Sequence, residues 1–188
     1  FFDRFKLENQ HDSAAYYIEL RAELDTANAV WQFDAAYYLG KQNQFQKATP
    51  YYEKALGIYR RLASADPQAY EPDVATTLNN LANLYSDTQR FTESEAMYRE
   101  ALEIYKRLYD TQPDLYRGRV AWIQYSLSYI YGQDDTHIEL YDQMLNDALT
   151  NYEVLYAGND NYKNKIVDLR NRKGWRLLAN NETASIYR

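Results

Sequence analysis

Residues 76–108 read TTLNNLANLYSDTQRFTESEAMYREALEIYKRL, and this stretch decides the fold. Its apolar side chains recur three and four residues apart on both sides of the polar segment 86–90, as in Leu78, Leu81 and Tyr85. That spacing places them on one face of a helix with 3.6 residues per turn. The stretch therefore predicts two amphipathic helices, about 72–88 and about 91–109, joined by a short turn.

The same pattern returns along the chain at an interval of 46 residues. When residues 45–86 are aligned with residues 91–132, fourteen of the 42 positions are identical, Tyr52/Tyr98 and Pro67/Pro113 among them. Because the matches fall at helical spacing, the repeating unit is a pair of helices.

Small residues and prolines mark the expected ends of these helices. Gly40, Ser86 and Gly132 recur near the end of the first helix of successive pairs, where we expect the chain to turn sharply. Pro72 suits the first turn of a helix, and Pro113 suits the stop after one. The next pair is accordingly expected to begin at about Tyr116.

One helix pair cannot bury its apolar face alone, so stacked pairs must share a continuous core. The sequence therefore predicts one array of such pairs over residues 1–188. Its parts are a truncated leading repeat at about 13–27, three repeats at about 28–65, 72–111 and 116–157, and a terminal capping helix at about 162–179.

The small and large residues of the repeats resemble those of the tetratricopeptide repeat family. In the third repeat these residues are Leu78, Leu81, Ala82, Tyr85, Phe91, Ser94, Tyr98 and Ala101; in the second they are Ala35, Ala36, Leu39, Phe45, Ala48, Tyr52 and Ala55. Over about residues 13–157 the chain is similar to the longer-period repeats of kinesin light chains and bacterial arrays. The resemblance implies an all-α fold, a right-handed superhelical solenoid of antiparallel helix pairs. The sequence departs from the family pattern at Gln32 and Gln124, where the family often places a large apolar residue.

Composition excludes several functional classes. The absence of cysteine excludes disulfides, thiolate metal sites and cysteine nucleophiles. A net charge of −6 argues against broad binding to nucleic-acid phosphates. The sequence contains no P-loop, GxGxxG or HExxH motif and only two histidines, so we expect a protein that is not an enzyme and holds no cofactor or metal.

The sequence does not indicate a cellular compartment. No apolar run is long enough to predict a transmembrane segment. The chain begins at Phe1 without a methionine or a signal-like segment, so we expect a fragment or processed form whose targeting segment lies outside this sequence.

The resemblance implies a concave groove formed mainly by the first helix of each pair. An asparagine amide carries both a donor and an acceptor, so it can hold a peptide backbone, and aromatic rings supply contact area with few rotors. At this point the aromatic residues have two open interpretations: they line the groove, or they pack on a neighbouring helix. Carried over residue by residue, the inward positions are Val30, Phe33 and Tyr37, then Thr76, Asn79 and Asn83, and finally Trp122, Tyr125 and Tyr129.

The favoured hypothesis is a non-catalytic interaction scaffold that binds a peptide or protein segment in this groove. A second hypothesis is a regulatory, sensor or targeting module of a larger protein. The basic segment 163–176 carries six positive residues against one acid, Asp168. It raises a weaker third hypothesis, contact with an acidic partner or nucleic acid, although nucleic acid is not the partner we expect.

Overall fold

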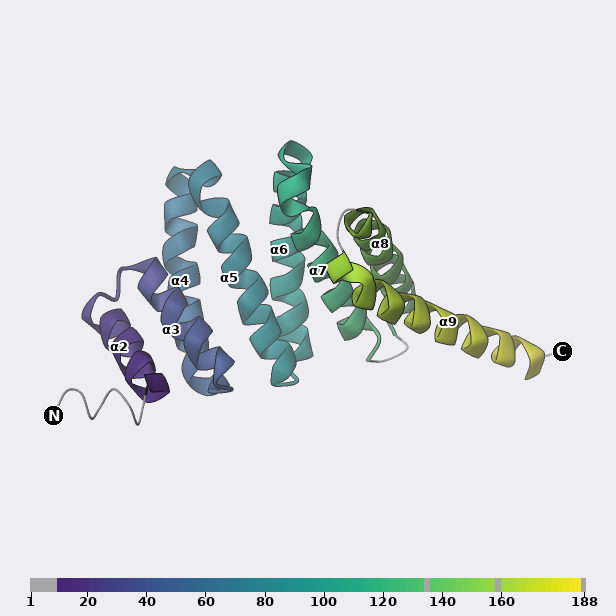
Figure 1. The fold of residues 1–188 in the computed structure, drawn as a ribbon, viewed down its shortest axis with the longest axis horizontal. Coiled ribbons are helices and arrows are strands. Elements are labelled where there is room, and N and C mark those ends of the chain that lie inside the picture. Colours follow the sequence, from purple (N-terminus) through teal and green to yellow (C-terminus); the bar gives the residue numbers. More distant parts are fainter. Residues whose placement is uncertain (1–9, 134–135, 158–159, 187–188) are drawn as a thin grey trace. The chain divides into compact units, whose positions relative to one another are not determined.

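The computed structural model describes residues 10–133, 136–157 and 160–186, and every element in these ranges is helical. The all-α fold class predicted from the sequence is thereby confirmed. The chain forms two compact units, residues 1–101 and 102–188, and the boundary between them lies inside helix α6 (Phe91–Thr111). Figure 1 shows the order of the helices along the chain.

The first unit consists of successive helices that each pack on the next. They are α2 (Gln10–Leu24), α3 (Ala29–Lys41), α4 (Phe45–Ala65), α5 (Pro67–Asp87) and the first part of α6. Alanines at the contact lines are fully buried, so the helices approach closely, as at Ala35, Ala55 and Ala82. A buried hydrogen bond of 2.8 Å from the Ser94 hydroxyl to the Ala82 carbonyl joins α6 to α5.

Helix α5 begins earlier than its apolar pattern predicts. Pro67 occupies the first turn, and the Asp66 side chain accepts a hydrogen bond of 3.1 Å from the backbone N–H of Ala69. The expectation that Pro72 opens this helix is therefore wrong, because Pro72 lies inside it. The same correction holds for α7 (Pro113–Tyr131), which begins at Pro113 rather than at about Tyr116. Proline is favoured at these first positions because its missing N–H needs no partner there.

The turns after α3 and α5 use left-handed backbone at residues other than glycine. Asn43 has φ 58° and Gln89 has φ 60°, and these two residues are one repeat interval apart. Of the small residues expected near the helix ends, Gly40 and Ser86 lie inside α3 and α5, whereas Gly132 is the C-cap of α7. No glycine of the described chain has a positive φ. Gly132 serves a different need, because a Cβ built there would lie 2.9 Å from the Tyr141 ring.

Replacing Gln89 with glycine should raise the free energy of unfolding by about 1 kcal/mol, because a side chain with a Cβ is strained in the left-handed region. Thermal denaturation followed by circular dichroism measures the change. The matched control is Gln42→Gly, at φ −91°, which relieves no strain and should destabilise the chain instead. A loss of stability for Gln89→Gly would contradict the assigned turn.

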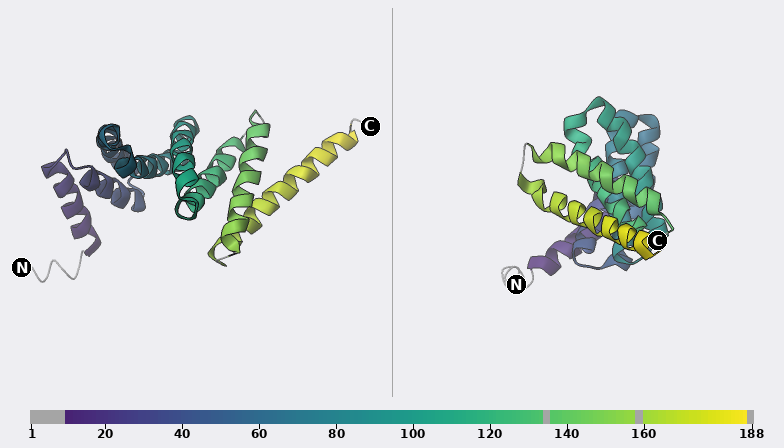
Figure 2. Two further views of the ribbon diagram at one scale, coloured as in Figure 1. Left: turned by 90° about the horizontal axis from the view of Figure 1, so that it is seen from above. Right: turned by 90° about the vertical axis from the view of Figure 1, so that its right-hand side faces the viewer.

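The second unit contains the rest of α6, then α7, α8 (Ile138–Tyr156), the short 3₁₀ turn η1 (Asp160–Tyr162) and α9 (Lys163–Ile186). Helix α9 starts beside the end of α8 and diverges from it toward Ile186 (Figures 1 and 2). Its first half supplies Ile166 and Leu169 to a core that they share with α7 and α8. The other buried members of that core are Ala121, Leu145, Ala148 and Tyr152.

The two glutamines that depart from the family pattern are buried and bonded differently. Gln32 is 0% exposed, and its Nε2 donates to the Ala22 carbonyl at 2.5 Å while its Oε1 has no partner among the described residues. Gln124 lies in the second unit, where its Oε1 accepts a hydrogen bond of 2.9 Å from Nδ2 of Asn151. The corresponding position of the repeat between them is the apolar Leu78.

Candidate functional site

The aromatic residues predicted on α3 lie together on one side of the helix. Phe33 and Tyr37 are stacked with ring centroids 6.4 Å apart, and Phe33 meets the buried Tyr52 edge-on at 5.5 Å. Tyr37 is 47% exposed and Val30 is 53% exposed, so both present apolar area to solvent. Phe33 therefore links the α4 core to the accessible Tyr37 ring.

The polar residues predicted on α5 have different roles. The Thr76 hydroxyl donates to the Pro72 carbonyl of its own helix at 2.8 Å. Asn83 accepts a hydrogen bond from the Tyr98 hydroxyl of α6, which fixes its amide in one orientation. Asn79 has a buried Oδ1 that no described residue contacts by a hydrogen bond.

A pocket of about 120 Å³ lies within the first unit between α3, α4 and α5. It brings together two of the predicted residues, Tyr37 and Asn83, whereas Phe33, Thr76 and Asn79 are not part of its lining. Helical spacing from Asn83 could have identified Asn80 and Asp87, which lie three residues before it and four residues after it. The full lining is Tyr37, Gly40, Lys41, Phe45, Tyr52, Asn80, Asn83, Leu84 and Asp87.

Polar groups of the pocket remain available for a ligand. Asn80 donates its Nδ2 to the Thr76 carbonyl at 3.0 Å, and no described residue bonds to its Oδ1. Asn83 uses only its Oδ1, so its Nδ2 remains a donor. Burial raises the pKa of the Tyr52 hydroxyl, and proximity to Tyr37 adds to the effect, so Tyr52 is neutral at physiological pH. The arrangement offers hydrogen-bond donors and acceptors beside aromatic faces.

The residues predicted on α7 meet the basic side chains of α9. The ammonium of Lys165 lies 3.9 Å from the centroid of the Tyr125 ring and 4.6 Å from that of Trp122. Burial raises the pKa of Tyr125, with a further contribution from its hydrogen bond to Asp168. Tyr125 packs against the core of the second unit, whereas Tyr129 is 50% exposed. The two open interpretations thus apply to different residues of this set, since Tyr125 packs and Tyr129 faces solvent.

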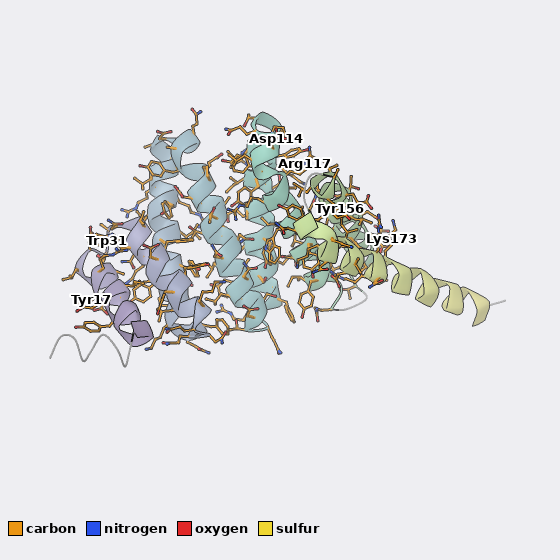
Figure 3. The ribbon with its side chains drawn as sticks, viewed as in Figure 1. Tyr17, Trp31, Asp114, Arg117, Tyr156 and Lys173 are labelled. Atoms are coloured by element: carbon orange, nitrogen blue, oxygen red, sulfur yellow. The ribbon has the colours of Figure 1, made fainter. Side chains whose placement is uncertain are left out.

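Several charges of the basic segment 163–176 contact neighbouring helices of the second unit. Arg170 pairs with Glu153 at 2.7 Å, and Lys173 donates to Asn146 Oδ1 at 2.7 Å. Lys173 is labelled on α9 in Figure 3. Burial lowers the pKa of Lys165, which sits over the α7 rings. The side chain of Arg176 lies outside the described residues. These contacts give the basic segment a role in holding α9 on α7 and α8.

Two kinds of feature are absent from the described part of the chain. No group of three or more His, Asp or Glu side chains there is placed to hold a metal ion. None of the described helices combines the length and the apolar character that a membrane-spanning helix requires.

Comparison with known proteins agrees with the repeat pattern. The profile of the tetratricopeptide repeat family matches residues 34–69 and 74–114. The fold is similar to the crystal structure of BtubC (BKLC) from P. vanneervenii, with a TM-score of 0.60 and 22% sequence identity over 95% of this chain and 78% of that one. Curated proteins gave no match. At 22% identity the structural likeness establishes the fold alone. Residues 34–69 and 74–114 therefore match the tetratricopeptide repeat, as the residues of the second and third repeats predict.

Proposed function

We propose that the chain is a non-catalytic binding scaffold that holds an extended segment of a protein partner against α3 and α5 of the first unit. Tetratricopeptide repeats generally mediate protein–protein interaction. The observation that carries the proposal is the pocket in which the exposed ring of Tyr37 and the amides of Asn80 and Asn83 meet.

The free hydrogen-bonding groups suit a peptide backbone. An extended segment presents N–H and C=O groups in alternation, and each needs a partner when it leaves water. The Asn80 Oδ1 can accept from such an N–H, and the Asn83 Nδ2 can donate to such a carbonyl. Because Tyr98 already holds the Asn83 amide, little rotamer entropy is lost when that group binds a ligand.

Simultaneous replacement of Asn80 and Asn83 with alanine should weaken binding of a groove-bound peptide by about threefold to tenfold for each hydrogen bond lost. Linear peptides selected from a random display library on the purified chain serve as the probe, and isothermal titration gives their dissociation constants. The matched control is Asn79→Ala, which changes the same residue type on the same helix but does not line the pocket.

A second variant blocks the pocket without touching the amides. A Cβ built on Gly40 meets nothing within 4 Å, so Gly40→Leu should fold and fill part of the space beside Tyr37. It should abolish binding of the selected peptides. Full affinity for both the blocked variant and the Asn80/Asn83 variant would show that the partner binds elsewhere.

A further inference from the structure

We propose that the pocket between α3 and α5 takes an arginine side chain of the bound segment. This inference rests on the proposed function, because it names the chemistry of the residue that enters the same pocket. Its support comes from charge, hydrogen-bonding capacity and size, each of which is set by described residues of the first unit.

Two helices end at the pocket. Gly40 and Lys41 are the last residues of α3, and Leu84 and Asp87 belong to the last turn of α5. The C-terminal end of a helix carries a partial negative charge, equivalent to about half an elementary charge. Two such ends meet at the pocket, and the start of α4 at Phe45, which carries the opposite partial charge, offsets one of them. The remaining helix potential favours a cation.

Two side chains of α5 in the pocket lining add hydrogen-bond acceptors. The Asp87 carboxylate is exposed and forms no ion pair or hydrogen bond among the residues that the structure describes. The Asn80 Oδ1 is a second acceptor with no partner in that part of the chain. A guanidinium presents five N–H donors in a plane, so it can donate to a carboxylate and keep further donors for other acceptors of the pocket.

The chain already places a cation of its own at this position. The ammonium of Lys41 lies 5.2 Å from the centroid of the Tyr37 ring, which is a cation–π contact at the rim of the pocket. Lys41 is exposed and makes no ion pair in the described structure, so it can move away at small cost. A partner's guanidinium would stack on the ring that Lys41 now covers, and Lys41 would act as a weak competitor.

The size of the pocket suits one long side chain. A space of about 120 Å³ has room for such a side chain. Phe45, Tyr52 and Leu84 form apolar walls that suit the methylene stem of arginine. Arginine fits better than lysine, because a planar guanidinium can lie against Tyr37 and hydrogen-bond at its edge.

The test compares four blocked pentapeptides, acetyl-Ala-Ala-Xaa-Ala-Ala-amide with Xaa as Arg, Lys, Gln or Glu, in NMR titrations of the labelled chain. The arginine peptide should shift the backbone signal of Gly40 and the side-chain amides of Asn80 and Asn83, and it should bind roughly tenfold more tightly than the glutamine peptide. Asp87→Asn should remove that preference, and Lys41→Gln should strengthen arginine binding about twofold to threefold. The matched control is Asp66→Asn, which removes the same charge at the opposite end of α5 and keeps the helix cap.

Equal affinity for the arginine and glutamine peptides, tighter binding of the glutamate peptide, or an arginine preference that survives Asp87→Asn would each overturn the proposal. So would the absence of any arginine-dependent shift at the pocket. These outcomes differ from those expected if the proposed function itself is wrong. If the proposed function is wrong, the library-selected peptides bind the Asn80/Asn83 variant as tightly as the wild type.

Discussion

Replacing Leu169 with alanine should lower the free energy of unfolding of the second unit by about 2–5 kcal/mol. Leu169 is 0% exposed and lies in the core that α9 shares with Ala121 of α7 and Tyr152 of α8. Its truncation removes apolar contacts and leaves a cavity that the surrounding helices close only in part. Urea denaturation followed by circular dichroism measures the loss, and hydrogen exchange of α9 peptides locates it.

The same helix offers a matched control. Val167 is 49% exposed, so Val167→Ala removes little buried area and should change stability by about 0.5 kcal/mol or less. If both variants behave alike, the first half of α9 is not packed on α7 and α8 as described. A loss confined to Leu169→Ala would establish that α9 completes the core of the second unit and is more than a solvated cap.

Replacing Asn151 with leucine should cost about 1–3 kcal/mol, because it leaves the buried Gln124 Oε1 without its donor. The double variant Gln124→Leu with Asn151→Leu should recover most of that loss, because two apolar side chains leave no unsatisfied group. Chemical denaturation of the wild type, both single variants and the double variant gives the coupling free energy. If the double variant loses the sum of the stability lost by the two single variants, the hydrogen bond between Gln124 and Asn151 is contradicted. Arg117 donates to Asn151 Oδ1 at 3.4 Å, a long contact whose loss adds little.

The sequence predicts the helices well where their apolar positions recur and poorly where they do not. The first turn of α5, from Pro67 to Ala69, is exposed, so it carries no apolar signal and its start was placed at Pro72. The position of Pro67 indicates the true start, because a proline just after the N-cap Asp66 can begin a helix as well as end the preceding one. Periodicity alone cannot distinguish these two uses.

The candidate site was predictable in part. The family resemblance implies which positions of the first helix of each pair face the groove, and it includes Tyr37 and Asn83, both of which line the pocket. Register does not identify the neighbour that packs on that face. Tyr125 was therefore expected to line the groove or to pack, and only the contacts of Lys165 and Asp168 distinguish these interpretations. Lys41 was missed because its ammonium reaches Tyr37 from the last turn of α3, outside the inward positions of the family.

The alternation of Gln32, Leu78 and Gln124 at one repeat position restricts the order in which the helix pairs can stack. Repeats of similar sequence are prone to pair with the wrong neighbour during folding. Gln32 finds its partner in the Ala22 carbonyl, and Gln124 finds its own in Asn151. A pair stacked one place out of order would bury one of these amides against a surface that lacks that partner, at a cost of about 1–3 kcal/mol. The two buried amides therefore favour the stacking order in which the Ala22 carbonyl and the Asn151 side chain lie beside them.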